Sequence, residues 1–514
     1  MAVSDLPEPR WVKLLDQSRC IGCHACTTAC KSENEVPVGV TRTYVKSVDV
    51  GVFPQVRRAF QVTRCNQCED APCVAACPTQ AMFRREDGIV DFDKSICIGC
   101  KACMAACPYD AIFINPEDHS AEKCNLCAHR LDVGLEPACV TVCPTEAILV
   151  GDLNDSASAV AQVINRDAVQ VRRPEKNTRP GVFYKGAHQA TLDPLAASRP
   201  DGGLFAWATQ GAPDPQLVTS GHPGRTVSSA AALLSYDVPH HAPWGWRVSL
   251  YTWTKSVAAG GFAVPAALAF AGILPWENAA ARWATPLLAL AFLALTGGLL
   301  VADLKHPERF YLIFTRRHWR SWLVRGAFIL NGFGVAAALY LVAALAGLTG
   351  ARQVLAVLGL PLAAAAAVYT AYLFAQAKGR DLWQSPLLPP HLAVQAALAG
   401  AAAMLPLLVW LAPGHAVVAD EVILAAAAAT HLLLAAGEIT LPHTLPATEG
   451  AHARLAAHEL SRGRYRRPFG LSLIFIAVAV AAPWIGTLAA PFALAGLLAY
   501  EHAYVQAGQS VPLA

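Results

Sequence analysis

Charged residues are scarce in this sequence, and cysteine is absent from most of it. Asp, Glu, Lys and Arg make up 15% of the 514 residues, whereas hydrophobic residues make up 54%. Because soluble domains typically contain about 25% charged residues, this composition argues against a wholly soluble chain. The net charge of +3 and the lack of a dense basic run argue against nucleic acid as a partner.

The uneven distribution of cysteines and apolar runs also divides the chain into two halves. All 16 cysteines lie between Cys20 and Cys143, whereas almost all long apolar runs follow Arg247. The first twenty residues contain neither an apolar core nor a twin-arginine pair, so we expect no secretory signal. Reducing compartments keep thiols free, and we therefore expect the cysteines to bind metal rather than to form disulfides.

The cysteines form four sets of four with short, regular gaps. The sets are Cys20, Cys23, Cys26 and Cys30; Cys65, Cys68, Cys73 and Cys77; Cys97, Cys100, Cys103 and Cys107; and Cys124, Cys127, Cys139 and Cys143. Sets one and three have the bacterial ferredoxin spacing, in which three cysteines ligate one cluster and the fourth ligates its neighbour. Pro78, Pro108 and Pro144 follow three of the fourth cysteines, and we expect them to begin helices.

A zinc protein is the main alternative. Zinc sites use two Cys-x2-Cys pairs for each ion and do not need a third cysteine at the same spacing, so iron–sulfur clusters are favoured. The pattern is also an internal repeat, because each set is followed by a short helix and a strand-like run, as at 88–92 and 147–150. The sequence therefore predicts a duplicated α+β domain like bacterial ferredoxin over residues 1–150.

The cysteine motifs carry a resemblance to a known family. They read CIGCHACTTAC, CNQCEDAPCVAACP, CIGCKACMAACPYDAI and KCNLCAHRLDVGLEPACVTVCPTEAI. This half resembles the four-cluster iron–sulfur subunit of the molybdopterin oxidoreductases, which include dimethyl sulfoxide, polysulfide and tetrathionate reductases. The resemblance implies four [4Fe-4S] clusters, with set one paired with set four and set two with set three. Cys143 would then complete the first cluster, Cys107 the second, Cys77 the third and Cys30 the fourth.

The remainder of the chain is predicted as a linker and a membrane domain. Residues 151–243 lack cysteines and long apolar runs and are rich in Pro, Gly, Asp and Arg, so we expect an extended linker. Residues 244–514 are expected to form an all-α bundle of about eight transmembrane helices, since about 20 apolar residues cross a bilayer. The expected spans are 248–274, 284–303, 321–349, 352–377, 391–412, 417–441, 468–487 and 489–508.

Basic residues are concentrated in alternate loops between these spans. The loops on the same side as the cysteine-rich half hold twelve Lys and Arg: Lys305, Arg309, Arg316, Arg317, Arg320, Lys378, Arg380, Arg454, Arg462, Arg464, Arg466 and Arg467. The opposite loops hold Arg282 and Arg352. By the positive-inside rule we expect the cysteine-rich domain on the cytoplasmic face of the inner membrane. The alternative is that the basic loops serve to dock that domain.

The apolar half carries a second resemblance. Its motifs YDVPHHAPWGW, YTWTKSVAAG, HPERFYLIFTRRHWRSWLVRGAF and HLLLAAGEI are similar to those of the NrfD or polysulfide reductase family, whose members are quinone-reactive membrane subunits. In that family the membrane subunit is usually a separate chain, so this sequence resembles a fusion of two subunits. The resemblance implies menaquinone or ubiquinone as a ligand in the membrane.

Candidate quinone-binding residues lie where the first span begins. A quinone needs an apolar slot and one or two hydrogen-bond partners near a cluster, and histidine exchanges protons near neutral pH. The candidates are Asp237, His240, His241, Tyr251 and Lys255. The alternatives are an interfacial aromatic belt, which better describes Trp244 and Trp246, and a lysine that only snorkels to the headgroups.

Ionisable residues inside the apolar spans are candidates for a proton path. Asp303 ends the second span, and His431 and Glu438 lie seven residues apart on one face of the sixth. The alternative is a buried pair that holds two helices together.

These features predict an electron-transfer and membrane-anchor subunit of a respiratory oxidoreductase, which carries electrons between a catalytic partner and the quinone pool. The chain has no residues recognisable for substrate chemistry, so the resemblance implies a molybdenum or tungsten pterin subunit as partner. The alternative is the equivalent subunit of a hydrogenase or another membrane redox complex, coupled to proton translocation. A transporter is disfavoured, because the apolar half shows no inverted repeat.

Overall fold

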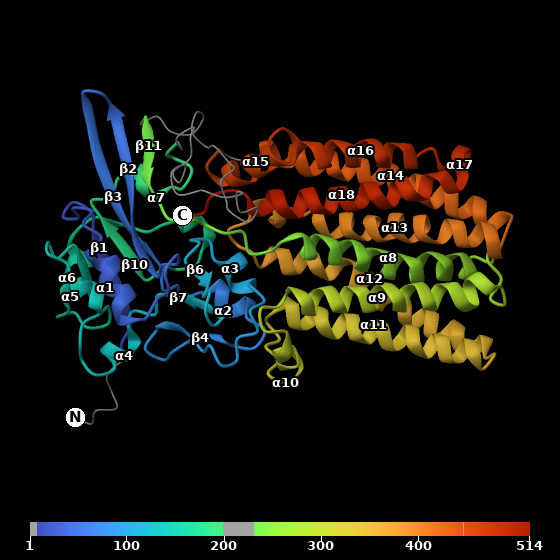
Figure 1. Cartoon of the computed structure of the whole chain (residues 1–514), viewed down its shortest axis with the longest axis horizontal. Coiled ribbons are helices and arrows are strands. Elements are labelled where there is room, and N and C mark those ends of the chain that lie inside the picture. The colour runs from blue at the N-terminus through green and yellow to red at the C-terminus, as the bar shows by residue number, and fades with distance from the viewer. Residues whose placement is uncertain (1–7, 199–230, 446) are drawn as a thin grey trace.

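The computed structural model describes residues 8–198, 231–445 and 447–514. Two parts lie end to end (Figure 1). The cysteine-rich part carries the sheets and short helices, and the other part is a bundle of long helices. The C-terminus lies at the junction of the two parts (Figure 1).

The strands belong to the cysteine-rich part. They are β1 (Trp11–Asp16), β2 (Thr43–Val52), β3 (Gln55–Arg64), β4 (Met82–Arg84), β5 (Val90–Phe92), β6 (Ile112–Ile114), β7 (Ala121–Lys123), β8 (Ile148–Asp152), β9 (Val169–Gln170), β10 (Val182–Lys185) and β11 (Ala232–Tyr236). One sheet has the order β8-β1-β10-β9, and a second has the order β11-β2-β3 and extends away from the body (Figure 1). Because β1 pairs with β8, the first and last cysteine sets lie at the same end.

Short helices are interspersed with the cysteines. They are α1 (Ala25–Glu33), α2 (Pro72–Ala76), α3 (Ala102–Ala106), α4 (Ala128–Leu131), α5 (Ala138–Thr141), α6 (Ala159–Arg166) and α7 (Gln189–Leu192). Helix α2 is followed by the two-stranded sheet β4-β5, and α3 by the two-stranded sheet β6-β7. This repeated unit confirms the prediction of a ferredoxin-type α+β half.

The prolines after the fourth cysteines do not begin helices, so that prediction was wrong for Pro78 and Pro108. Helices α2 and α3 instead end just before Cys77 and Cys107, whose backbones are extended with ψ of 118° and 116°. Proline disfavours the helical conformation of the residue that precedes it. Each proline therefore ends a helix and holds the fourth cysteine in an extended conformation.

The predicted extended linker is also wrong in its first part. Residues 151–198 contain α6, β9, β10 and α7, and β10 pairs in parallel with β1 in the middle of a sheet. Strand β10 has the alternating burial of a half-buried strand, but it is too short for its periodicity to stand out in sequence. The segment 199–230, which the linker prediction also covered, lies outside the described residues.

The second part is helical throughout. Its helices are α8 (Trp246–Phe270), α9 (Thr285–Asp303), α10 (Leu312–Thr315), α11 (Trp322–Leu345), α12 (Thr349–Ala375), α13 (Leu388–Leu411), α14 (His415–Thr440), α15 (Ala447–Ser461), α16 (Arg466–Ala479), α17 (Ala482–Ile485) and α18 (Ala489–Gln509). Six stretches of the described chain are long and apolar enough to cross a membrane: Ala280–Asp303, Trp322–Leu345, Thr349–Ala375, Leu388–Leu411, His415–His443 and Ala482–Gln509. An integral membrane part is therefore confirmed.

Helices also occupy the other two predicted spans. Helix α8 has 25 residues but includes Arg247 and Lys255, and α16 has 14 residues. Neither is among the six apolar stretches, so the count of eight spans stays a prediction.

Small residues let the helices of this bundle approach closely. Gly260 of α8 faces Gly400 of α13, and a Cβ atom on Gly260 would lie 1.7 Å from the carbonyl oxygen of Ala396. Small residues at helix contacts are typical of membrane proteins. This contact fixes α8, which carries Tyr251 and Lys255, against the centre of the bundle.

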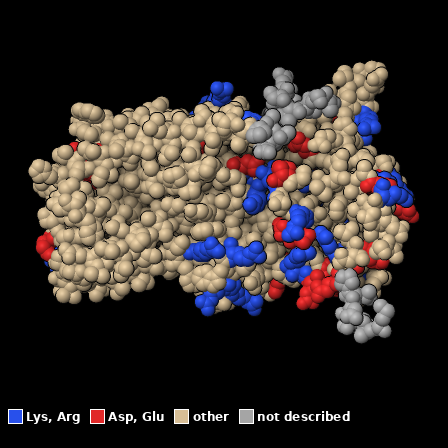
Figure 2. All heavy atoms as spheres, turned by 180° about the vertical axis from the view of Figure 1, so that it is seen from behind, with Lys and Arg blue, Asp and Glu red and all other residues tan. Residues whose placement is uncertain are grey.

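Charged side chains are few on the helical part, and Lys and Arg gather where it meets the cysteine-rich part (Figure 2). Backbone contacts hold the junction: the amide of His306 donates to the carbonyl of Ile98 at 3.2 Å. The guanidinium of Arg380 donates to the carbonyls of Gln509 and Val511 at 3.0 and 3.1 Å. Arg172 of the cysteine-rich part donates to the carbonyl of Leu513 at 3.2 Å, so the chain segment after α18 is held between the two parts.

Candidate functional site

Cysteines from different sets converge on three cavities. The first cysteine group is Cys20, Cys23, Cys26 and Cys143, the second is Cys65, Cys68, Cys73 and Cys107, and the third is Cys77, Cys97, Cys100 and Cys103. These are the groupings that the family resemblance implies.

The other four cysteines also lie together, and Cys30, Cys124, Cys127 and Cys139 are called the fourth cysteine group. The Asn34 Nδ2 atom lies 3.8 Å from Cys30 Sγ and 3.7 Å from Cys127 Sγ. Burial raises the pKa of the Cys30 thiol to about 12, and the charges of Cys124, Cys139 and Cys127 add to the effect. Helix α1 therefore contributes one cysteine to a group whose other three members come from the last set.

The donor set fits iron–sulfur clusters. Four cysteine thiolates are the usual ligands of a [4Fe-4S] cluster, and in each of the first three groups all four cysteines line one cavity. A zinc ion would instead draw the sulfur atoms to about 2.3 Å from one point. In the described parts of the chain, no group of three or more His, Cys, Asp or Glu side chains is placed to hold a single ion. Backbone amides donate to the sulfurs, as from Met82 to Cys77 at 3.3 Å and from Ala147 to Cys143 at 3.2 Å.

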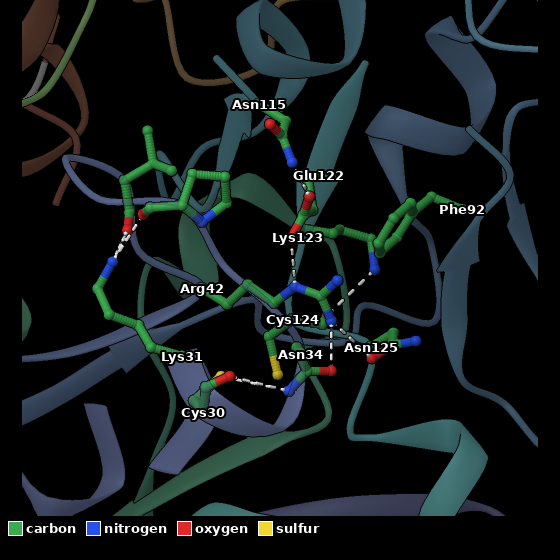
Figure 3. A network of polar contacts seen from close by, with 12 residues as sticks. Cys30, Lys31, Asn34, Arg42, Phe92, Asn115, Glu122, Lys123, Cys124 and Asn125 are labelled. Carbon is green, nitrogen blue, oxygen red and sulfur yellow. Dashed lines mark hydrogen bonds and ion pairs between the residues drawn. The ribbon is translucent and has the colours of Figure 1, made fainter. Parts of the chain in front are cut away.

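A polar network supports the fourth cysteine group (Figure 3). The Arg42 guanidinium donates to Glu122 Oε1 and to Asn34 Oδ1, both at 2.7 Å. Glu122 also accepts from Asn115 at 2.9 Å. With its oxygen held by Arg42, the Asn34 amide directs its nitrogen at the carbonyl oxygen and sulfur of Cys30 (Figure 3).

The four groups follow one another in a line. The cysteine pairs whose charges interact across groups are Cys26–Cys139, Cys65–Cys124 and Cys73–Cys103. The spatial order is therefore first, fourth, second and third. Such an order suits electrons that pass step by step from one end of the domain to the other.

The loop of the third group rests directly on the helical part. The Trp244 Nε1 atom donates to the carbonyl of Cys100 at 3.2 Å, and Lys101 forms an ion pair with Asp303 at 2.9 Å. Gly99 has φ +66°, and a Cβ atom there would lie 2.4 Å from Cβ of Lys305. Only glycine permits this close approach without displacing the end of α9.

An apolar cavity of about 600 Å³ begins at this contact and lies among α8, α9, α10, α11 and α12. Cys100 of the third group borders it, and the rest of its lining is mostly Leu, Val, Ala, Gly and Phe side chains. Its polar lining residues are Trp244, Tyr251, Asp303, Asn331 and Tyr369. The Tyr251 hydroxyl is buried and makes no hydrogen bond with any residue that the structure describes. The cavity can therefore take an apolar ring with a hydrogen-bonding edge.

A second, more polar cavity of about 640 Å³ lies on the other side of Asp303, between the two parts of the chain. His240, His241, Asp110 and Lys101 border it, and Asp303 borders both cavities. His240 bridges two carboxylates: its Nδ1 is 2.8 Å from Asp110 and its Nε2 is 3.1 Å from Asp237.

Both carboxylates shift the ionisation of His240. Burial lowers the pKa of the imidazole, but the charges of Asp237 and Asp110 outweigh burial and raise that pKa to about 9. The His240 cation in turn holds the pKa of Asp110 below its usual value against the effect of burial. His240 therefore ties the segment before α8 to the loop after the third set.

Buried ionisable side chains form a connected chain in the helical part. His431 Nδ1 lies 2.9 Å from His391 Nε2, and His391 Nδ1 lies 3.1 Å from Glu438 Oε1. The Tyr500 hydroxyl donates to Glu438 at 2.5 Å. His431 and Glu438 thus belong to one chain, as the sequence predicted for a proton path, with His391 between them. Their role in moving protons stays a prediction.

Comparison with known proteins identifies the membrane part. The family described as polysulphide reductase, NrfD, matches residues 236–512, which is more than half of the chain. This protein belongs to the NrfD family. In front of its NrfD part, a 4Fe-4S binding domain matches residues 11–32, and a 4Fe-4S dicluster domain matches residues 56–153. The iron–sulfur character of the cysteine-rich half is therefore confirmed, together with the fusion of the two modules.

Curated relatives match the cysteine-rich half of this NrfD-family protein. The tetrathionate reductase of Salmonella typhimurium has a subunit that is 46% identical over 193 residues, which are 37% of this chain and 77% of the relative. The polysulfide reductase of Wolinella succinogenes has a component that is 42% identical over 171 residues, 33% of this chain and 90% of the relative. Thiosulfate reductase electron transfer subunit PhsB of Salmonella typhi is 49% identical over 150 residues, 29% of this chain and 78% of the relative.

The structure separates the residues that the sequence analysis had grouped as quinone ligands. Tyr251 borders the apolar cavity, whereas His240 and His241 border the polar one. Lys255 is fully buried, and its ammonium donates to the carbonyl of Ala367 at 2.5 Å, so it does not snorkel. Asp237 pairs with His240. A role of His240 or His241 in quinone binding stays a prediction, but the apolar cavity is not the one that these histidines border.

Some residues of the NrfD junction were missed or misread from sequence. Trp244 was expected in an interfacial belt, but it is buried, donates to Cys100 and stacks on Trp383 with ring centroids 5.6 Å apart. Trp246, by contrast, is 58% exposed. Lys101 lies between two ligand positions of the third set, and its contact with Asp303 joins residues about two hundred positions apart. No local pattern could have predicted such a pair.

The ionisation of His240 predicts a pH-dependent stability. The folded-state pKa of about 9 exceeds the usual histidine pKa of about 6.5. The stabilisation is therefore complete below about pH 6.5 and is lost as the pH rises through about 9. Thermal unfolding in detergent should show that His240→Gln is less stable than the wild type at pH 6.5 and equally stable near pH 9.5.

The charged and titratable neighbours of His240 are Asp110, Asp237, Tyr44 and, through Asp110, Arg380. None of them is changed in this variant, so the difference between the two proteins isolates the imidazole. A difference in melting temperature that stays constant from pH 6.5 to 9.5 would contradict this assignment.

Proposed function

We propose that the protein is the electron-transfer and membrane-anchor subunit of a respiratory oxidoreductase. Relatives of its cysteine-rich half are subunits of tetrathionate, thiosulfate and polysulfide reductases, and its other half belongs to the NrfD family. A molybdenum or tungsten pterin subunit is the proposed catalytic partner. Electrons pass between that partner and the membrane quinone pool, and this chain supplies the route.

Four [4Fe-4S] clusters are proposed, one for each cysteine group. When bound, such clusters supply one-electron transfer without proton movement. The groups divide all 16 cysteines among four sites without a remainder, and the thiolates of each group hold one cluster. The residues between the ligands exclude water and provide amide donors that stabilise negative charge on sulfur.

The partner subunit is proposed to dock at the first cysteine group. Cys23 of this group is the exposed cysteine, whereas every cysteine of the second group is buried. Ile21 beside it is 58% exposed and Val142 is 41% exposed. An apolar surface around the accessible end of the cluster line suits a subunit interface.

The quinone is proposed to bind in the apolar cavity among α8, α9, α11 and α12. The observation that carries this proposal is that Cys100, a ligand position of the third group, borders the same cavity as Tyr251 and Asp303. A ring held there is next to the end of the cluster line. The Tyr251 hydroxyl would donate to a quinone oxygen, and Asp303 would exchange protons with the polar cavity behind it.

The membrane is proposed to be the bacterial inner membrane, with the cysteine-rich part in the cytoplasm. The loops on the side of the cysteine-rich part hold twelve Lys and Arg, among them Lys305 and Arg380, whereas the opposite loops hold Arg282 and Arg352. This asymmetry supports the positive-inside orientation.

Replacing Tyr251 by Phe tests the quinone site. The change removes one hydrogen bond, which contributes about 1 kcal/mol, so quinone-dependent turnover of the purified complex should fall roughly fivefold. Turnover with a soluble dye, which does not enter the membrane, should stay as in the wild type. Tyr340→Phe is the matched control, because Tyr340 is a buried tyrosine that donates to Ala281 away from this cavity.

One outcome would contradict this location of the quinone site. If His240→Ala abolished quinone turnover and Tyr251→Phe left it intact, the quinone would bind in the polar cavity instead.

An epitope inserted after Gly347, in the exposed turn between α11 and α12, tests the orientation. Antibody should reach this epitope in intact cells with a permeable outer membrane, because the turn lies opposite the cysteine-rich part. The same epitope in the β2–β3 turn at Phe53, which is 88% exposed, should be reached only after lysis. The reverse labelling would place the cysteine-rich part outside.

A further inference from the structure

Two buried cations contact one sulfur of the fourth cysteine group. Lys13 Nζ lies 3.6 Å and Arg64 Nη1 lies 3.2 Å from Cys139 Sγ. Lys13 is 0% and Arg64 1% exposed. A buried cation is costly unless an anion compensates its charge. Both side chains therefore require a negative charge at this group.

No carboxylate provides that charge. Within the described residues, Cys139 is the side-chain partner of Lys13, and the Nε and Nη2 atoms of Arg64 make no hydrogen bond. A thiolate that ligates an anionic cluster is the compensating anion that this arrangement fits.

The other three cysteine groups do not have two buried cations in contact with one sulfur. The charge of the buried Lys123 acts on Cys65 and Cys73 of the second group, but its ammonium donates to the carbonyl oxygens of Val90 and Cys124 and not to a sulfur. Lys101 beside the third group is paired with Asp303. Positive charge and hydrogen bonds at the sulfur favour the reduced, more negative state of a cluster.

We propose that Lys13 and Arg64 give the cluster of the fourth cysteine group the highest reduction potential of the four, so that it acts as the electron reservoir of this chain. The Asn34 amide, which lies near Cys30 and Cys127 in the same group, adds to the effect. The inference rests on the proposed function, because it presupposes that the four groups hold clusters.

The reservoir lies second in the line of groups. An electron that reaches it from the second or first group oxidises that neighbour by one electron and reduces the fourth group by one, and no bond or proton is exchanged. Reaching the quinone cavity from there requires passage through the second and third groups. Lys13 and Arg64 are thus positioning residues that act through the cluster and touch neither substrate nor quinone.

Lys13→Met tests this assignment in the full-length protein purified without oxygen. Methionine keeps the length of the side chain and removes the charge. Potentiometric titration followed by electron paramagnetic resonance should show that the highest of the four midpoint potentials moves to a lower value, by more than any of the other three. Arg64→Gln should have the same effect, and Lys13→Arg should restore the wild-type midpoint.

Lys185→Met is the matched control, because Lys185 lies on the neighbouring strand β10 and pairs with Asp16 and Asp167 instead of sulfur. It should leave all four midpoints unchanged. Unchanged midpoints in Lys13→Met and Arg64→Gln would overturn the inference, as would a shift in a lower-potential cluster only. Loss of the cluster from both variants would also overturn it, since the cations would then hold the cluster and not set its potential.

Iron content separates this inference from the proposed function. Wild-type protein is expected to contain about sixteen iron atoms per chain. If it does, and neither variant shifts a midpoint potential, the reservoir inference is wrong and the proposed electron route still holds. If the wild-type protein contains no iron, both the reservoir inference and the proposed function are wrong.

Discussion

The contact between the third cysteine loop and the end of α9 joins the two halves of the molecule. Gly99 allows the loop to lie against Lys305 at a distance that any side chain would prevent. The ion pair of Lys101 with Asp303 and the hydrogen bond from Trp244 to Cys100 fix the same loop from two other directions. Because Cys100 also borders the apolar cavity, this contact decides how close the last cluster site lies to the proposed quinone.

The cysteine groups differ in the buried charges that lie beside them. The third group has a cation that is neutralised by a carboxylate, whereas the fourth has two cations with sulfur as their partner. A uniform set of clusters would pass electrons with little preference for any position. In the proposed scheme, unequal environments would give each cluster its own potential, so that the fourth group would hold an electron until the quinone or the catalytic partner accepts it.

Much of the cysteine-rich half could be predicted from its sequence, because ligand spacing is a local property. The spacing of Cys97, Cys100 and Cys103 identified iron–sulfur chemistry, which the matching 4Fe-4S families confirm. The prolines were misread because Pro78 suits both the start of a helix and the residue after its end. The strand β10 was missed because its place beside β1 depends on pairing across the whole domain.

In the membrane half, the helices could be predicted from the sequence, but the contacts between them could not. Apolar length was enough to locate the helices, and His431 and Glu438 were correctly placed on one face of α14. Their partner His391 lies on α13, and helix neighbours cannot be read from hydropathy. The quinone residues were sought by their position before the first span, so His240 and Tyr251 were grouped although they face different cavities.

The most direct test of the account is a reduction of the clusters by quinol in the isolated protein. Anaerobic, oxidised protein in detergent is mixed with a short-chain menaquinol or ubiquinol, and electron paramagnetic resonance follows the appearance of reduced [4Fe-4S] signals. The account predicts reduction without a catalytic subunit, at a rate that falls in Tyr251→Phe. Clusters that stay oxidised with either quinol, but are reduced by dithionite, would contradict a route between the quinone cavity and the cysteine groups.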